Sequence, residues 1–179
     1  MRDKRRRNNR LLNYDYSQNG WYFTTICTAG RKNYFGAIVD DKMVLNEYGK
    51  IVEKYWREIA DHYDQIKLDE FVIMPNHIHG IIIIQNNQQG LNYVGTEQCS
   101  VPTRNNRFGL ISKVIKSYKE AVIKFIRHNY HDNDFAWQRS FYDHVIRNEK
   151  SLDNIRHYIR YNPLQWAVDR ENIVNYIND

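Results

Sequence analysis

The chain has 179 residues, of which 42% are apolar and 14% aromatic, which suits one sizeable hydrophobic core rather than two. The net charge is +5, and six of the first ten residues are Arg or Lys, so we expect either a polyanionic partner or a solvated basic tail. Cys27 and Cys99 lie far apart, which argues against a disulfide framework or a cysteine zinc site. The longest apolar run, residues 81–84, is too short to span a bilayer. We expect a soluble, cytoplasmic protein.

Two strand-like segments open the predicted domain. Residues 21–28 and 34–39 are rich in aromatic and β-branched types, and the AGRKN between them supplies turn residues, so the two segments predict a β-hairpin. From Leu45 to Ile59, apolar side chains recur at three- and four-residue spacing. This spacing predicts a helix that packs on the sheet.

A second pair of strands is predicted in the middle of the chain. Residues 67–74 and 77–85 are apolar and β-branched, and Pro75 and Asn76 between them favour a tight turn. We expect both strands to be central and antiparallel. Residues 86–107 are polar and lack periodicity, which predicts a long loop.

The last third of the chain predicts helix, strand and helix. Apolar periodicity indicates a helix over residues 110–126, and the SFYDHVI segment at 140–146 is strand-like. The final helix is expected to begin at Ser151 or at the preceding lysine and to end at Pro163.

This order of elements predicts an α+β fold, a ferredoxin-like antiparallel sheet with helices packed on one side. We expect residues 1–20 to form a basic N-terminal arm. A single domain then covers residues 21–166, and residues 167–179 form a C-terminal tail.

The triplet His77-Ile78-His79 is the first candidate for chemistry. Side chains alternate along a strand, so both imidazoles leave one face while Ile78 enters the core. Two imidazoles aimed at one point can bind a metal ion. The alternative is a pair of hydrogen-bonded surface histidines.

The last helix places Tyr158 and Asn162 one turn apart. Their position beside the apolar residues of that helix suits a site where the helix crosses the sheet. The alternatives are a tyrosine at the edge of the core and an asparagine that caps the helix end. Tyr118, flanked by lysines, is a competing tyrosine, but its spacing places it on the buried face of the second helix.

Three segments together resemble the REP-associated tyrosine transposases, within the wider superfamily of single-tyrosine HUH transposases. They are NYDYSQNGWYFTTICT, FVIMPNHIHGIIII and WQRSFYDHVIRNEKSLDNIRHYIRYNPLQW. The resemblance covers nearly the whole chain, roughly residues 13–166. It implies an HUH nuclease type of fold.

The resemblance also implies roles for individual residues. Tyr158 would be the nucleophile, and His77, His79 and Asn162 would bind a divalent ion, Mg²⁺ or Mn²⁺. The implied enzyme is a single-strand DNA endonuclease and transposase that forms a 5′-phosphotyrosine intermediate on hairpin, REP-like palindromic DNA. A phenol is a weak nucleophile with a pKa near ~10, and a bound cation offsets the charge that grows on the phosphate.

Two other functions fit the same residues. One is a domesticated protein that binds hairpin DNA without cutting it; the other is a replication- or relaxase-type HUH nuclease, which the small size of the chain disfavours. Either a monomer or a homodimer satisfies the sequence. The side chains predicted to contact DNA phosphates are Arg5, Arg6, Arg7, Lys116, Arg156 and Arg160.

Overall fold

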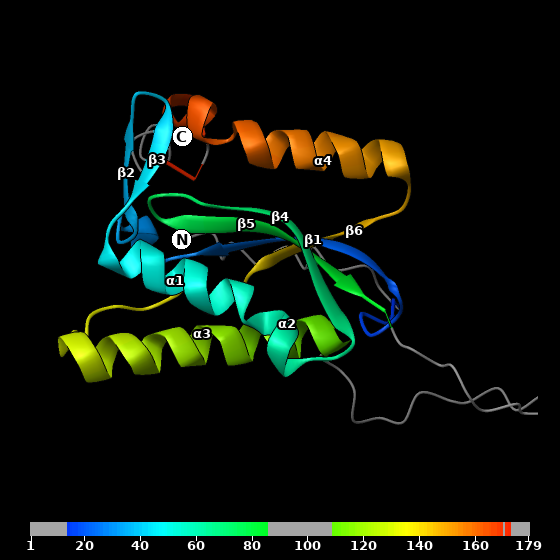
Figure 1. Cartoon of the computed structure of the whole chain (residues 1–179), viewed down its shortest axis with the longest axis horizontal. Helices are drawn as coiled ribbons and strands as arrows, with labels where there is room; N and C mark the ends of the chain where they lie inside the picture. The colour runs from blue at the N-terminus through cyan, green and yellow to red at the C-terminus, as the bar shows by residue number, and fades with distance from the viewer. Residues whose placement is uncertain (1–13, 86–108, 170, 173–179) are drawn as a thin grey trace, which may run out of the picture.

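The computed structural model describes residues 14–85, 109–169 and 171–172. Strands within these ranges are β1 (Gly20–Cys27), β2 (Gly36–Val39), β3 (Lys42–Leu45), β4 (Ile66–Ile73), β5 (His77–Ile84) and β6 (Tyr142–Ile146). Helices are α1 (Glu47–Arg57), α2 (Ile59–His62), α3 (Gly109–Tyr130) and α4 (Glu149–Tyr161), with 3₁₀ turns η1 (Ala29–Arg31) and η2 (Pro163–Val168). The main sheet is antiparallel with the order β4-β5-β1-β6. Helices α1 and α3 cover one face of this sheet, and α4 lies along the other (Figure 1).

The predicted hairpin of β4 and β5 is confirmed. Its tight turn at Pro75 and Asn76 is closed by a 2.8 Å hydrogen bond from the backbone N–H of Met74 to the carbonyl oxygen of His77. Strand β5 is central, as expected, since it pairs with both β4 and β1. The expectation that β4 is also central is wrong, because β4 forms one edge of the sheet.

The predicted hairpin of residues 21–28 with 34–39 is wrong. Strand β1 pairs with β5 and β6, whereas β2 pairs with β3 in a separate two-stranded sheet. The AGRKN segment forms the 3₁₀ turn η1 instead of a hairpin turn. The turn that does form lies at Asp40 and Asp41, which both have positive φ, a conformation that Asp tolerates better than most residues.

Helix α1 begins later than the apolar spacing suggested, because Leu45 ends β3 and Asn46 caps the helix. The side-chain oxygen of Asn46 accepts a 2.9 Å hydrogen bond from the N–H of Gly49. Trp56 of α1 is completely buried against Gly80 of β5. A Cβ at position 80 would lie 2.3 Å from the Trp56 ring, so this close approach requires glycine.

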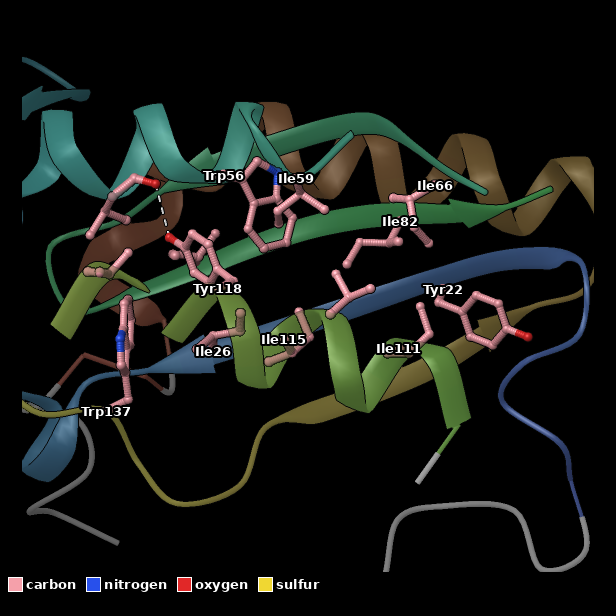
Figure 2. Close-up of a cluster of buried hydrophobic side chains, with 14 of the residues drawn as sticks. Tyr22, Ile26, Trp56, Ile59, Ile66, Ile82, Ile111, Ile115, Tyr118 and Trp137 are labelled. Atoms are coloured by element: carbon pink, nitrogen blue, oxygen red, sulfur yellow. Dashed lines mark hydrogen bonds between the residues drawn. The ribbon is translucent and has the colours of Figure 1, made fainter. Parts of the chain in front are cut away.

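The main core lies between the sheet and the helices α1 and α3. Tyr118 of α3 is buried in it, as the spacing predicted, and its hydroxyl donates a 3.0 Å hydrogen bond to the carbonyl oxygen of Val52. Figure 2 shows side chains from both helices and from the strands filling this layer. Among them are Tyr22, Ile26, Trp56, Ile59, Ile66, Ile82, Ile111, Ile115 and Trp137.

Helix α4 packs on the opposite face of the sheet. It is capped by Asn148 rather than by Ser151 or the preceding lysine, because the Asn148 side chain accepts a 2.8 Å hydrogen bond from the N–H of Ser151. It ends before Pro163, as expected, and η2 follows directly. The buried apolar residues of this second, smaller cluster are Ile81, Ile146, Leu152 and Ile159.

The predicted α+β class is confirmed, with an antiparallel sheet and α1 and α3 together on one side. The folded region extends beyond the predicted 21–166 at both ends, since Tyr16 and Asp169 are buried in it. The predicted loop at 86–107 and residues 1–13 of the predicted arm lie outside the described residues. In the described part of the chain, no helix combines the length and the apolar composition that crossing a membrane requires.

Candidate active site

Strand β5 presents His77 and His79 on the same face of the sheet. Ile78 between them packs in the main core with α1 and α3, while the two imidazoles face the side on which α4 lies. The ring centroids of the histidines are 4.4 Å apart. Both rings are buried rather than exposed, so they are not the surface pair that was the alternative.

His77 is held at only one of its two ring nitrogens. Its Nδ1 lies 2.8 Å from the side-chain oxygen of Asn76. Its Nε2 is buried and has no hydrogen-bond partner among the described residues. Burial, with a smaller contribution from the charge of Arg31, lowers the pKa of His77 to about 3. The ring is therefore neutral at physiological pH, the form in which histidine binds metals.

His79 is in contact with three side chains that fix the plane of its ring. Its Nδ1 lies 2.8 Å from the hydroxyl of Thr25 on β1, and the ring stacks on Phe23 at a centroid distance of 5.3 Å. Its Nε2 lies 3.1 Å from the hydroxyl of Tyr158. The strand that carries the histidines and the helix that carries the tyrosine thus meet at this nitrogen.

Tyr158 lies on the side of α4 that overhangs β5. Its ring contacts Phe23 edge-on at 6.1 Å and His79 at 5.1 Å. Even so, 38% of the residue is exposed. Tyr158 therefore lies between the buried polar cluster and solvent.

Asn162 is completely buried one turn after Tyr158. Its amide nitrogen donates a 3.1 Å hydrogen bond to a carboxylate oxygen of Asp169, while its amide oxygen is buried without a partner in the described chain. A residue before proline usually avoids the α region, but the φ and ψ of Asn162 are −58° and −41°, because η2 continues directly from α4.

Asp169 completes a compact group with the two histidines. One ligand atom from each of His77, His79 and Asp169 lies within 4.8 Å of the others, and all three residues are buried. The predicted ligand set carried no negative charge, whereas this group contains a carboxylate. The Asp169 carboxylate also accepts a 2.6 Å hydrogen bond from the N–H of Glu171.

Asp169 was not predicted as a ligand, because residues 167–179 were expected to form a C-terminal tail. The only available signal was order along the chain, since Asp169 is the first acidic residue after Tyr158. No periodicity links it to the histidines. The 3₁₀ turn η2 follows α4 directly (Figure 1), and Asp169 at the end of η2 lies close to both histidines.

The chain is similar to known proteins in sequence and in fold. The chain is 37% identical to an uncharacterised protein of Haemophilus influenzae, over 92% of both chains. It is 26% identical to a candidate REP-associated tyrosine transposase of the same organism, over 87% of this chain and 77% of the relative. A solved REP-associated tyrosine transposase bound to a REP hairpin shares the fold, with a TM-score of 0.55 at 18% identity over 87% of this chain and 73% of that one. The chain is therefore similar in sequence and in fold to REP-associated tyrosine transposases. No family model matches it.

Arg156 and Arg160 do not point into the site. Arg156 donates to both carboxylate oxygens of Asp69, at 2.6 Å from Nη2, and Arg160 pairs with Glu70. A bulge in β4 at these two acidic residues lets consecutive side chains both reach α4. The two arginines therefore hold α4 onto the edge strand β4.

The remaining predicted DNA contacts lie away from the site. Lys116 is exposed on α3, across the sheet from the histidines, and forms a 3.7 Å ion pair with Glu120. Arg5, Arg6 and Arg7 lie outside the described residues.

Proposed function

We propose that this protein is a metal-dependent transposase that cuts and rejoins single-stranded DNA through Tyr158. The observation that supports this most directly is the 3.1 Å contact between the Tyr158 hydroxyl and Nε2 of His79, at the edge of the buried group formed with His77 and Asp169. A weakly acidic phenol next to a candidate cation site is what phosphodiester cleavage by a tyrosine requires.

The residues present fit a divalent ion. Two buried acceptor atoms, Nε2 of His77 and Oδ1 of Asn162, have no partner among the described residues, and a cation would satisfy both. His77, His79 and Asp169 would hold the ion, with the Asn162 oxygen as a further ligand, and this mixed nitrogen and oxygen set suits Mn²⁺ or Mg²⁺. When bound, the ion would neutralise charge on the scissile phosphate.

The chain's own residues supply the nucleophile and its orientation. The Tyr158 oxygen would form a bond to phosphorus as the bond from phosphorus to the 3′ oxygen breaks, which leaves a 5′-phosphotyrosine and a free 3′-hydroxyl. Attack by a 3′-hydroxyl on that link would restore a phosphodiester and free Tyr158. Both steps conserve the number of phosphate ester bonds, so neither needs ATP.

Hairpin DNA is the proposed substrate. The solved relative of the same fold is bound to a REP hairpin, and the net charge of +5 favours a polyanion. Because Tyr158 is 38% exposed, part of the proposed nucleophile is open to solvent, as attack on a bound strand requires.

The test is a denaturing gel with labelled hairpin oligonucleotides taken from the flanks of the gene, in Mn²⁺ or in EDTA. We expect a covalent protein–DNA adduct in Mn²⁺ that is lost in EDTA and in Tyr158→Phe. Tyr161→Phe, on the exposed side of the same helix, is the matched control and should form the adduct. Hairpin binding without an adduct in Mn²⁺ would instead identify a domesticated DNA-binding protein.

A further inference from the structure

Asn76 is the second residue of the tight turn between β4 and β5. Turn asparagines usually face solvent, but this one is completely buried. Its side-chain amide makes three hydrogen bonds, to His77 and to the backbone of Arg31 and Glu171. A buried amide with every polar atom paired fixes the groups around it.

The first of these hydrogen bonds determines which nitrogen of His77 carries hydrogen. The Asn76 oxygen, 2.8 Å from Nδ1, can only accept, so Nδ1 must donate. Turning the amide over would place its oxygen against the carbonyl oxygens of Arg31 and Glu171, so the contacts fix its orientation. In the neutral ring this leaves a lone pair on Nε2, the nitrogen without a partner in the described chain.

The other two hydrogen bonds hold the segment that carries Asp169. The Asn76 amide nitrogen donates to the carbonyl oxygens of Glu171 at 2.9 Å and Arg31 at 3.0 Å. The Arg31 side chain in turn binds the carboxylate of Glu171, at 2.8 Å from Nε. Since the N–H of Glu171 donates to Asp169, Asn76 is linked to both the histidine and the carboxylate of the candidate site.

We propose that Asn76 is a positioning residue that sets two metal ligands at once: the tautomer of His77 through its oxygen and the place of Asp169 through its nitrogen. This inference rests on the proposed metal site and adds the residue that assembles it. The two ligands come from distant parts of the chain, and Asn76 joins them through one amide group. Partners of metal ligands typically change metal affinity by about 10- to 100-fold when removed.

The first experiment uses the whole protein without metal. Long-range ¹H–¹⁵N NMR of the imidazoles should show His77 with hydrogen on Nδ1, and Asn76→Ala should lose this single tautomer. Calorimetric titration with Mn²⁺ should then show about 10- to 100-fold weaker binding by Asn76→Ala. An unchanged tautomer together with Mn²⁺ affinity within a factor of two of wild type would overturn the proposal.

Two further variants separate positioning from a general loss of stability. Asn46→Ala removes the cap of α1 on the other face of the sheet. It should lower the stability of the protein but change neither the tautomer of His77 nor Mn²⁺ binding. Asn76→Asp keeps an oxygen for His77 but cannot donate to Glu171. It should keep the tautomer while hydrogen exchange at the Glu171 amide becomes faster, and equal protection of that amide would count against the second half of the proposal.

Failure of the proposed function gives a different result. If wild type binds no Mn²⁺, the metal site is refuted, while the tautomer of His77 and the exchange of the Glu171 amide still show whether Asn76 organises both segments.

Discussion

The two faces of the sheet differ in what they leave unpaired. The face covered by α1 and α3 is a continuous apolar core, and its buried polar atoms without a partner in the described residues are the indole N–H groups of Trp56 and Trp137. On the α4 face the corresponding atoms are Nε2 of His77 and Oδ1 of Asn162. Among the described residues, the α1 and α3 face therefore has unpaired hydrogen-bond donors, whereas the α4 face has unpaired acceptors.

Whether the unpaired atoms are donors or acceptors indicates which kind of ligand each face can bind. A cation stabilises unpaired acceptors and repels unpaired donors, so only the α4 face fits an ion. The apolar cluster under α4 is also smaller than the core under α1 and α3. We therefore expect the first face to carry most of the free energy of unfolding and the second to carry the chemistry.

The largest loss of stability should come from removing a large side chain from the core under α1 and α3. Trp56→Ala removes a completely buried ring that packs on Gly80 and Tyr118, and should lower the free energy of unfolding by about 3–5 kcal/mol. Urea denaturation measures this change. Mn²⁺ affinity of the folded variant should stay within a factor of two of wild type; a large loss would show that the two faces are not independent.

The same contrast explains what the sequence could predict. The main core follows from local periodicity, so the spacing of Val114, Tyr118 and Val122 was enough to place the buried face of α3. The alternation of His77 and His79 likewise placed both rings on one face. The pairing of β2 with β3 was not predicted, because four-residue strands carry little periodic signal and their turn, at Asp40 and Asp41, lacks glycine.

The rest of the site depends on contacts between distant segments. Asp169 lies close to the histidines because η2 turns the chain back after α4. Asn76 is hydrogen-bonded to Glu171, which lies 95 residues away in the sequence. Neither contact leaves a local pattern in the sequence. Tyr158 could be singled out only by its spacing to Asn162 and by resemblance to a family.

The second largest change in stability should come from binding a cation at the candidate site on the α4 face. At a free Mn²⁺ concentration of 100 times Kd, the ion should raise the free energy of unfolding by about 2.7 kcal/mol, seen as a higher Tm that EDTA reverses. His77→Ala should abolish this shift. His144→Ala, at an exposed histidine on β6, is the matched control and should keep it.

A smaller effect is expected where α4 is held to the edge of the sheet. Arg156 is one-third exposed and Asp69 is mostly buried, so Arg156→Ala should lower the free energy of unfolding by about 1 kcal/mol. Because Tyr158 lies two residues away on the same helix, adduct formation should also slow. Lys50→Ala removes an exposed ion pair with Glu47 on α1 and should change neither quantity; equal effects of the two variants would remove any special role for the α4 contact.

The smallest effect should come from Lys116→Ala. Because Lys116 lies on the face opposite Tyr158, this variant tests whether DNA contacts only the α4 face. A lysine that touches a phosphate contributes to the salt dependence of binding, and its loss lowers the slope of log K against log salt by about one. Lys116 lies on α3, and the whole sheet separates it from Tyr158. A strand held at Tyr158 would have to pass around the sheet edge to reach it. We therefore expect Lys116→Ala to leave both the hairpin affinity and the salt slope unchanged in a fluorescence anisotropy titration. A slope reduced by about one would instead show that DNA wraps from the α4 face onto the α3 face, and that the core face also contributes to binding.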